Sequence, residues 1–449
     1  MCADASDGTH VVTAFLRHRG DVLLLRRSDA VGTYQGRWGG VSGFAEGDPD
    51  EQVRTEIREE TGLEPGDSVS FVRSGRPVTV DDPDLGREWI VHPYLFDAAH
   101  REVDLSEEHD AFEWVSPTEL LGGFEETESD EDALETVPEL WSAYERVAPT
   151  VRSIAADDEH GAAALSVRAL EVVRDRAGLL VAERAEYGDD PEGEWDELAA
   201  LAGRLLEARP AMAVLRNRVN RAMADAGEHA ADDAIGAPEV LDAASAGLDR
   251  AILADSDAAA AAADRLEGTI LTLSRSGTVL EALREGEPSR LFVAESRPER
   301  EGVTVAEELA GDESLECPIT VHTDAAAAHL LSREAIDRVV VGADTIRHDG
   351  SVVNKTGTRG VALAATREGI PVSVVAATDK VSTREEVNLE SGDRSAVYDG
   401  EASLDVANPT FDVTPADCVE EYVTERGALE DEDVGDVVAQ LRELEDWRE

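Results

Sequence analysis

The alternation of short apolar runs with helix-like segments in residues 267–449 constrains the fold more than any other feature. The runs are rich in β-branched residues and read GTILTLS (268–274), RLFVAES (290–296), ITVHT (319–323), RVVVGAD (338–344) and PVSVVAA (371–377). Short apolar runs at this spacing predict a parallel sheet that helices cover on both faces, and therefore an α/β fold.

Residues 147–266 change to alanine, leucine, glutamate and arginine at helical spacing. Segments 160–177, 194–210, 211–226 and 241–266 predict four successive amphipathic helices. We interpret the alanine run in the last of them as helix packing rather than as a low-complexity segment. This stretch is therefore expected to form a helical subdomain.

Residues 1–146 combine strand-like runs with one strong helix. Residues 10–27 predict two strands joined by an Arg-Gly-Asp turn, and residues 88–96 predict a further strand. Residues 109–121 predict a strand that leads into a helix start at a Ser-Pro pair. Segment 125–135 is so acidic that we interpret it as a solvated connector.

Length and these changes of pattern divide the chain into three parts. Its 449 residues are enough for two or three domains by the usual relation between length and domain number. We expect domain boundaries at 1–146, 147–266 and 267–449.

Charge restricts the partners and surroundings of the protein. Asp and Glu number 98 against 41 Lys and Arg, a formal net charge of −57, and the only lysines are Lys355 and Lys380. An acidic surface nearly free of lysine favours solubility in concentrated salt, where cations screen self-repulsion. We expect a halophile's cytoplasm. So negative a surface argues against direct binding of nucleic acid or of anionic membranes, because both need a basic footprint.

The cysteines and the apolar runs agree with a cytoplasmic location. Cys2, Cys317 and Cys418 show neither a metal-ligand spacing nor a paired framework, which suits a reducing cytosol. No run has the length of a membrane span, and the N-terminus lacks the pattern of a secretory signal.

Residues 43–63 read GFAEGDPDEQVRTEIREETGL and predict a helix with a candidate metal site. Glu56, Glu59 and Glu60 lie at i, i+3 and i+4, so their carboxylates share one helix face. Clustered carboxylates repel one another unless a cation neutralises them, and Mg²⁺ and Mn²⁺ prefer oxygen ligands. Such a metal could bridge a diphosphate and activate water for its hydrolysis. The alternative is a solvated helix face; the glycine loop before the helix and its end at Gly62 favour the site.

With this motif, residues 8–146 resemble the Nudix hydrolases. The family's box is Gly, five residues, Glu, seven residues, Arg-Glu-apolar-x-Glu-Glu-x-Gly-apolar, and TEIREETGL matches its end. Thr55 replaces the family's arginine, and the loop from Gly43 is one residue short, which leaves Glu46 or Asp48 as the first acid. The resemblance implies an α/β/α sandwich with a mixed sheet, the three glutamates as metal ligands, and hydrolysis of diphosphate linkages. A degenerate domain that only binds nucleotide is the alternative.

The carboxyl ends of the predicted parallel strands gather candidate ligand-binding residues, because sites in such sheets lie there. These residues are Ser274, Glu295, Arg297 and Asp344. Asp344 ends a buried run, and VVNKTGT with Lys355 follows it. Lys355 supplies charge for an anion, and backbone N–H groups near Gly357 can supplement it, which suits a phosphorylated or carbonyl ligand. Asp344 could instead cap the next helix.

Residues 150–449 resemble the family that unites the alpha, beta and delta subunits of translation initiation factor 2B with ribose 1,5-bisphosphate isomerase and methylthioribose 1-phosphate isomerase. The likeness is carried, in order, by EHGAAALSVRALEVV, GTILTLSRS, ESRPEREG, GADTIRHDGSVVNKTGT and NPTFDVTPADCVEEYVTERG. It implies a helical subdomain, a Rossmann-like domain with the parallel sheet, and a homodimer or higher homo-oligomer through this region.

The resemblance also implies roles for single residues. The isomerases carry a catalytic Cys in the loop matching TLSRS and an Asp in GAD, and these positions hold Ser274 and Asp344 here. A serine hydroxyl is a far poorer acid than a thiol, whose pKa is near ~8.5. We therefore expect Ser274 to impair isomerisation unless a neighbouring group takes over. Asn354 and Lys355 match the family's Asn-Lys, and the candidates for phosphate binding are Arg275, Arg297 and Arg300.

The two resemblances together predict a Mg²⁺- or Mn²⁺-dependent pyrophosphohydrolase acting on a nucleoside diphosphate derivative or a sugar pyrophosphate. It would be fused to a domain that binds a phosphosugar or nucleotide and whose isomerase activity Ser274 puts in doubt. The expected partner is a small phosphorylated substrate. The alternative is a regulatory or assembly protein akin to initiation factor 2B, with the Nudix domain as a ligand sensor.

Overall fold

The computed structural model describes residues 8–83, 85–122, 134–157, 160–229, 235–312, 315–386 and 389–448. They belong to two compact units. The first unit comprises residues 1–156, 168–201 and 229–245, and the second comprises residues 157–167, 202–228 and 246–449. The acidic connector predicted for 125–135 lies outside the described residues except for its last two positions.

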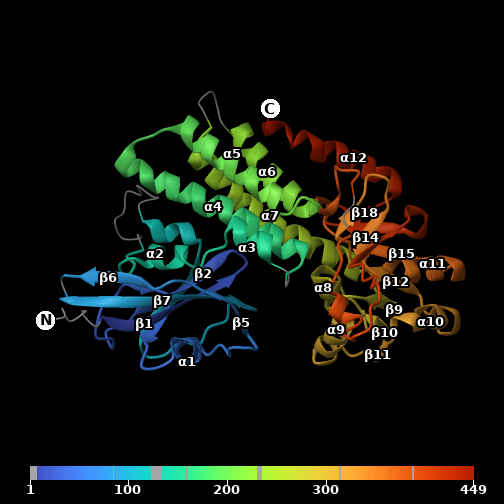
Figure 1. The fold of residues 1–449 in the computed structure, drawn as a ribbon, viewed down its shortest axis with the longest axis horizontal. Helices are drawn as coiled ribbons and strands as arrows, with labels where there is room; N and C mark the ends of the chain where they lie inside the picture. Colours follow the sequence, from blue (N-terminus) through green and yellow to red (C-terminus); the bar gives the residue numbers. More distant parts are fainter. Residues whose placement is uncertain are drawn as a thin grey trace. The chain divides into compact units, whose positions relative to one another are not determined.

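The first unit is built on an eight-stranded sheet whose main path runs β3-β2-β1-β7-β5 (Figure 1). β1 and β7 pair in parallel and the other pairs are antiparallel, so the predicted mixed sheet is confirmed. The strands predicted in 10–27, 88–96 and 109–121 are confirmed as β1 with β2, β7 and β8. The bounds are β1 (Thr9–His18), β2 (Asp21–Arg27), β3 (Trp38–Gly39), β4 (Val41–Phe44), β5 (Val69–Ser74), β6 (Val78–Asp82), β7 (Arg87–Ala98) and β8 (His109–Val115).

Helices cover both faces of this sheet, which confirms the predicted α/β/α sandwich. Successive strand residues point to opposite faces. Leu23 accordingly packs in one cluster with Ile57 of α1 (Pro49–Thr61), while Leu24 packs in another with Tyr144 of α2 (Leu140–Glu145). The 3-10 helix η1 (Pro117–Leu121), at the predicted Ser-Pro start, adds to the second cluster.

The four predicted helices are confirmed as α4 (Ala162–Tyr187), α5 (Pro191–Ala208), α6 (Ala213–His229) and α7 (Ala237–Ala263), and the short α3 (Val151–Ala156) precedes them. α4, α5 and α7 each contribute residues to both units. Within the first unit, α4 is more than an amphipathic helix, because its buried charged side chains reach the sheet and α2. Glu171 accepts from Arg17 of β1 at 2.8 Å, and Asp175 accepts from Tyr144 at 3.0 Å.

The second unit is built on a seven-stranded sheet of order β11-β10-β9-β12-β15-β17-β18. All neighbours are parallel except β17 and β18, so the predicted parallel sheet is confirmed. The five predicted strands are β9 (Gly268–Leu273), β10 (Pro288–Ala294), β11 (Ile319–His322), β12 (Arg338–Val341) and β15 (Val372–Val375). Two further strands, β17 (Glu421–Thr424) and β18 (Gly427–Leu429), extend it.

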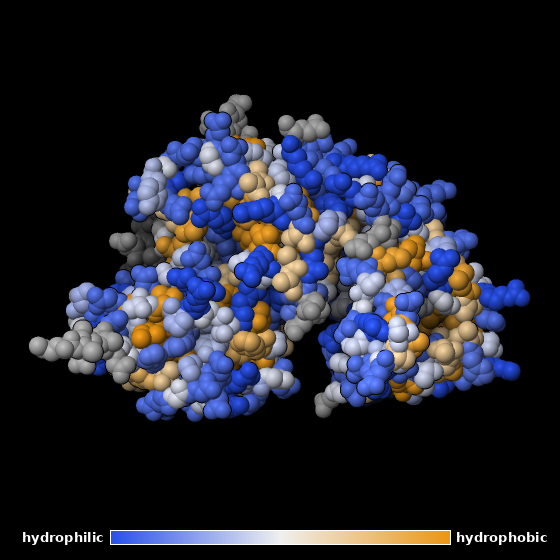
Figure 2. All heavy atoms as spheres, in the orientation of Figure 1, coloured by the Kyte–Doolittle hydropathy of each residue, from blue (hydrophilic) through white to orange (hydrophobic). Residues whose placement is uncertain are grey.

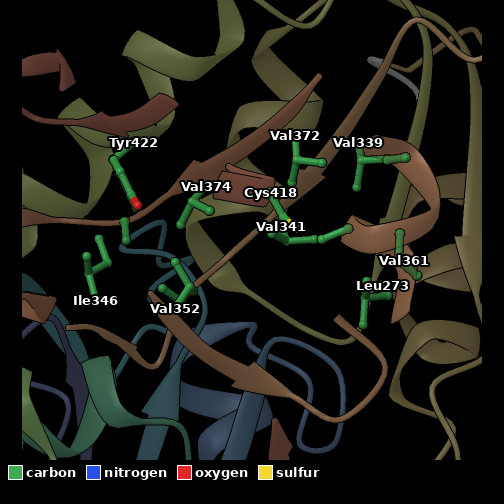
Figure 3. Packing of buried hydrophobic residues seen from close by; sticks show 14 of the residues in the cluster. Leu273, Val339, Val341, Ile346, Val352, Val361, Val372, Val374, Cys418 and Tyr422 are labelled. Carbon is green, nitrogen blue, oxygen red and sulfur yellow. The ribbon is translucent and has the colours of Figure 1, made fainter. Parts of the chain in front are cut away.

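Both faces of the parallel sheet are buried, as the continuous apolar runs predict. Val339 and Val341 of β12 pack with α10 (Ala327–Arg333), α11 (Thr358–Glu368) and α12 (Asp431–Glu443), in the cluster shown in Figure 3. Val340, between them, packs with α7, α8 (Gly277–Glu285) and α9 (Glu301–Ala310).

A small antiparallel sheet, which the sequence did not predict, lies beyond β12. It consists of β13 (Thr345–Ile346), β14 (Val352–Lys355) and β16 (Phe411–Thr414), paired in the order β13-β14-β16. It fixes Lys355 at the end of a strand, in the stretch that the sequence pattern indicated as a glycine-rich loop.

The surface agrees with the acidic composition, since hydrophilic residues predominate on the face in Figure 2 and hydrophobic residues form scattered patches. Among the described residues, no helix combines the length and apolarity needed to cross a bilayer. The boundaries at 1–146, 147–266 and 267–449 stay a prediction.

Candidate active sites

The first site is built around α1, whose ends follow from the local sequence. Asp48 caps the helix by accepting a hydrogen bond from the backbone N–H of Asp50 at 3.0 Å, and Pro49 fits the first turn, where no N–H is required. Gly62 ends the helix with a φ of 70°. Ile57 is fully buried against the sheet, which fixes the rotation of the helix and the directions of its glutamates.

The three predicted metal ligands lie at different depths. Glu60 is 3% exposed, and its Oε2 accepts a hydrogen bond from the backbone N–H of Ser42 at 3.1 Å. Glu56 is half-buried, and its Oε1 accepts from Nε2 of Gln52 at 2.6 Å. Glu59 is exposed. One helix thus presents three carboxylates that range from buried, at Glu60, to exposed, at Glu59.

β4 approaches α1 so closely at Gly43 that any larger residue there would displace the carboxylate of Glu56. A Cβ atom on Gly43 would lie 1.9 Å from Oε1 of Glu56. Glycine has no Cβ, so it lets the backbone of the strand and the carboxylate of the helix share this space.

Electrostatics set two of these carboxylates apart. Burial raises the pKa of Glu60 well above 4.5, and the charges of Glu56 and Glu108 add to the rise. Burial also raises the pKa of Glu56, with contributions from Glu59 and Glu108. A carboxyl pKa is raised when the surroundings do not stabilise the ionised carboxylate. A bound cation would therefore stabilise the ionised forms of both Glu56 and Glu60. Glu108, just before β8, acts on both glutamates, and the sequence pattern gave no sign of it.

A cavity of about 510 Å³ joins these acids to an aromatic wall. Phe44 of β4 is 54% exposed, and its ring centroid lies 6.2 Å from that of Trp89 on β7. The guanidinium carbon of Arg87 lies 5.6 Å from the centroid of the same indole. The lining includes Tyr34, Ser42, Gly43, Phe44, Glu56, Glu59, Arg87, Trp89 and Glu108.

The donor set of this cavity fits a hard divalent cation, because every candidate ligand is a carboxylate oxygen. Within the described ranges, no three His, Cys, Asp or Glu side chains already converge on a point where a metal could sit. The fit therefore rests on the chemistry of the donors and on the raised pKa values of Glu56 and Glu60.

The second site lies where the strand order of the parallel sheet reverses. β9 is flanked by β10 on one side and by β12 on the other, and the chain proceeds outward from each. In sheets of this kind, ligands bind outside the carboxyl ends of the two strands at the reversal. Ser274 directly follows β9, and Asp344 follows β12 closely. The predicted pair therefore flanks the expected crevice.

Both lysines of the chain act on Asp344. Lys380 is 8% exposed, and its Nζ donates a hydrogen bond to the backbone oxygen of Ala343 at 2.6 Å. Burial raises the pKa of Asp344, and the ammonium groups of Lys380 and Lys355 oppose this rise. The sequence pattern singled out Lys355 alone, although the rarity of lysine was a signal that pointed to Lys380 as well.

Ser274, Glu301 and Lys355 form a connected group. Oγ of Ser274 donates a hydrogen bond to Oε2 of Glu301 at 2.7 Å, and Nζ of Lys355 lies 2.9 Å from Oε1 of Glu301. Glu301 opens α9 within the ESRPEREG segment. In that segment the sequence pattern drew attention to the arginines and missed this glutamate.

The three predicted phosphate-binding arginines lie at the surface. Arg275 pairs with Glu308 at 3.2 Å, and its side chain is 51% exposed. Arg300 lies 3.9 Å from Glu295 and is 57% exposed, and Arg297 is also exposed. Their role in phosphate binding stays a prediction.

A second cavity, of about 260 Å³, reaches Asp344. Its other lining residues are Thr345, Val353, Glu390, Phe411, Ala162 and residues 208–212, where α5 gives way to α6. Ser274 and Lys355 are not among them. Asn354 is buried and donates from Nδ2 to Oγ1 of Thr358 at 3.0 Å, which supports the turn into α11.

Two family models match the chain. The NUDIX domain model matches residues 8–140, which hold the first site, and the model of the Initiation factor 2 subunit family matches residues 158–431, which hold the second.

Related proteins and structures agree with these matches. Ribose 1,5-bisphosphate isomerase of Haloferax volcanii is 32% identical over 317 residues, which cover 67% of this chain and 94% of that protein. Methylthioribose-1-phosphate isomerase of Pseudomonas aeruginosa is 36% identical over 171 residues, which cover 34% of this chain and 46% of that protein.

Among solved structures, the translation initiation factor eIF-2B of Pyrococcus horikoshii matches with a TM-score of 0.50 and 27% identity, covering 62% of this chain and 94% of that one. The 5-methylthioribose 1-phosphate isomerase of Pyrococcus horikoshii matches with a TM-score of 0.52 and 21% identity, covering 84% of this chain and 96% of that one. At this identity the match supports the fold alone. The chain therefore belongs to the initiation factor 2 subunit family and carries a NUDIX domain in residues 8–140.

Proposed function

We propose that this chain is a two-site enzyme of phosphorylated metabolites. The first site hydrolyses the diphosphate linkage of a nucleoside diphosphate derivative with Mg²⁺ or Mn²⁺, and the second isomerises a sugar phosphate. The observation that carries the first assignment is the cavity of about 510 Å³, in which carboxylates of α1 and exposed aromatic side chains line one space.

The aromatic wall favours a nucleoside diphosphate derivative over a sugar pyrophosphate. Phe44 is 54% exposed and lines the same cavity as Glu56, Glu59 and Glu108, which suits a flat base stacked on the ring. Stacking of a base on an aromatic side chain contributes about 1–3 kcal/mol. A sugar pyrophosphate has no aromatic ring to stack on Phe44 or Trp89.

Glu56, Glu59 and Glu60 would hold the divalent cation, which when bound supplies charge neutralisation at the diphosphate and lowers the pKa of water. The chain's own groups do the rest. Phe44 and Trp89 orient the base. Glu108 lines the same cavity as Glu56 and Glu59, and we assign to its carboxylate the proton released by the attacking water.

Isomerisation at the second site is supported by the relatives named as isomerases and by the buried Asp344. Asp344 lines the cavity of about 260 Å³ and burial raises the pKa of its carboxyl, so we assign to it the transfer of a proton to a sugar oxygen, while Lys355 and Lys380 supply positive charge nearby. We give these two observations, the isomerase relatives and Asp344, more weight than the loss of activity expected from serine at position 274.

The hydrolase assignment is tested by screening nucleoside diphosphate sugars in molar KCl with Mg²⁺. Phosphoribosyl pyrophosphate serves as the substrate without a base. We expect turnover of the nucleotides, a loss of about 10²-fold or more in kcat with Glu59→Gln, and little change with Glu51→Gln, an exposed glutamate of the first turn of α1. Preference for phosphoribosyl pyrophosphate would contradict the base assignment, and equal activity of the Glu59 variant would contradict the site.

A regulatory or assembly protein is the second candidate function, because the eIF-2B structure of Pyrococcus horikoshii shares the fold of the second unit. In that case the NUDIX domain would sense a ligand. Ligand binding without turnover at either site would favour this alternative.

We further propose that the chain assembles into a homodimer or higher homo-oligomer through its C-terminal region and works in a salt-rich cytoplasm. Static light scattering in molar KCl measures the mass directly, and a monomeric mass of 48.1 kDa would contradict the assembly.

A further inference from the structure

We propose that Glu301 is the proton acceptor of the second site and that it acts through the hydroxyl of Ser274, in place of an ionised thiol. The inference rests on the proposed isomerase function of this site. Its starting point is the hydrogen bond from Oγ of Ser274 to Oε2 of Glu301 at 2.7 Å. A hydroxyl that donates its proton to a carboxylate keeps its lone pairs available for a proton from a substrate.

The backbone holds Ser274 in an unusual conformation that aims its side chain. Its φ is 62°, in the left-handed region, which costs a non-glycine residue about 1–3 kcal/mol and persists only where the surroundings impose it. Its N–H donates to Oγ of Ser296 at 2.7 Å, and the N–H of Ser296 donates to Asp324 at 2.8 Å. The first hydrogen bond therefore ties the loop after β9 to the loop after β10, and the second ties the loop after β10 to the segment after β11.

Glu301 is held as firmly from the other side. The residue after it, Gly302, comes so close to β10 that a Cβ atom would lie 1.8 Å from the backbone oxygen of Ala294. The start of α9 is therefore pressed against the sheet beside Ser274. Lys355, 14% exposed, contacts the second carboxylate oxygen of Glu301 at 2.9 Å, so that each of the two oxygens of this carboxylate has a partner.

Asp344 completes the group as the acid. Asp344 follows β12 and Ser274 follows the neighbouring parallel strand β9, so both lie at the same edge of the sheet. Burial raises the pKa of Asp344, and Glu301 adds to the rise while Lys355 opposes it. The proposed site thus contains the carboxyl group of Asp344, the carboxylate of Glu301 and the hydroxyl of Ser274 that donates to it, which are the parts that proton-transfer chemistry requires.

The proposed step balances for an aldose 1-phosphate. The C1–ring oxygen bond breaks, its electron pair goes to the ring oxygen, and this oxygen takes the proton of Asp344. The proton on C2 passes to Oγ of Ser274 while the hydroxyl proton moves to Glu301, and the C–H electron pair forms the C1=C2 bond of an enol phosphate. The proton then returns to C1 along the same route as the C2 hydroxyl gives its proton to Asp344, which leaves a 2-ketose 1-phosphate.

The test compares variants of the full chain on ribose 1,5-bisphosphate in molar KCl. Glu301→Gln keeps the size of the side chain and its oxygen but removes the proton acceptor. We expect kcat to fall by about 10²–10⁴-fold, with little change in KM. The matched control is Glu299→Gln, since Glu299 also faces Lys355, at 3.9 Å, and is 47% exposed. We expect its kcat to change by less than about threefold.

A second substitution tests whether Glu301 transfers a proton or only holds the side chain of Lys355 in position. Ser274→Cys added to Glu301→Gln should recover most of the lost kcat, because a thiol can ionise without a partner. In D₂O, the wild type should place deuterium at C1 of the ketose. Full activity of Glu301→Gln, or no rescue by Ser274→Cys, would overturn the inference alone. No turnover by the wild type would overturn the proposed isomerase function with it.

Discussion

Replacing Arg17 with methionine tests whether α4 is an integral part of the first unit. The guanidinium of Arg17 on β1 contacts Asp97 at 2.7 Å and Glu171 of α4 at 2.8 Å. Burial lowers the pKa of Arg17, but the carboxylates of Glu171 and Asp97 outweigh burial and raise it. In the variant, Asp97 keeps its contact with Arg168 at 3.0 Å. Glu171, whose side chain is 2% exposed, loses its ion pair with Arg17 and is therefore destabilised more.

The magnitude follows from that burial. Removing one partner of a buried ion pair leaves an uncompensated charge in the interior and costs about 3–5 kcal/mol of the free energy of unfolding. The control is Arg58→Met, because Arg58 pairs with Glu64 at 2.9 Å while both side chains are about half exposed. Exposed pairs contribute about 0–1 kcal/mol, and salt screens them further.

Urea unfolding in molar KCl, followed by tryptophan fluorescence, measures both variants. The signal reports chiefly on the first unit, which holds Trp38, Trp89, Trp114, Trp141 and Trp195 out of six tryptophans. A double-mutant cycle with Glu171→Gln should return a coupling energy of about 2–3 kcal/mol. If Arg17→Met shifts the midpoint no more than Arg58→Met does, the ion pair is dispensable and the reasoning from burial is refuted.

Three further predictions concern the two sites. Gly43→Ala should lower metal-dependent hydrolysis by about 10²-fold, because a Cβ atom 1.9 Å from Oε1 of Glu56 displaces that carboxylate, whereas Gly47→Ala, with nothing within 4 Å, should leave it unchanged. In EDTA, the raised pKa of Glu60 gives the wild type stability that is present at low pH and lost as pH rises from about 4.5, so Glu60→Gln should remove this part of the pH dependence in urea titrations. Lys380→Met removes an ammonium group near Asp344, so it should raise the pKa of Asp344 further and move the alkaline limb of the isomerase pH profile to higher pH. An unchanged limb would contradict this assignment.

Local patterns predicted much of the fold, because they depend on interactions between near neighbours. The apolar runs of residues 267–377 predicted five of the seven strands of the parallel sheet, and the helical spacing of the glutamates with the end signal at Gly62 predicted α1. β17 and β18 were missed, since their few apolar residues lie among acidic ones and they become strands only through the pairing of β17 with β15 and of β18 with β17.

The parts of the site that come from distant segments could not be predicted in the same way. Phe44 and Trp89 meet because β4 and β7 both pair with β1, a relation that no local pattern encodes. Glu301 looked like one acid among many in a chain with 98 of them. It stands out only when α9 brings it within hydrogen-bonding distance of Ser274.

The sequence by itself determined the elements, the helix face shared by Glu56, Glu59 and Glu60, and the positions of Ser274 and Asp344 at strand ends, because helix and strand periodicities act over a few residues. The tertiary structure decided which of these groups are buried, which carry raised pKa values, and which meet. Burial and charge pairing depend on groups far apart along the chain, so only the folded arrangement sets the depth of Glu60, the two lysines around Asp344, and the contact of Ser274 with Glu301.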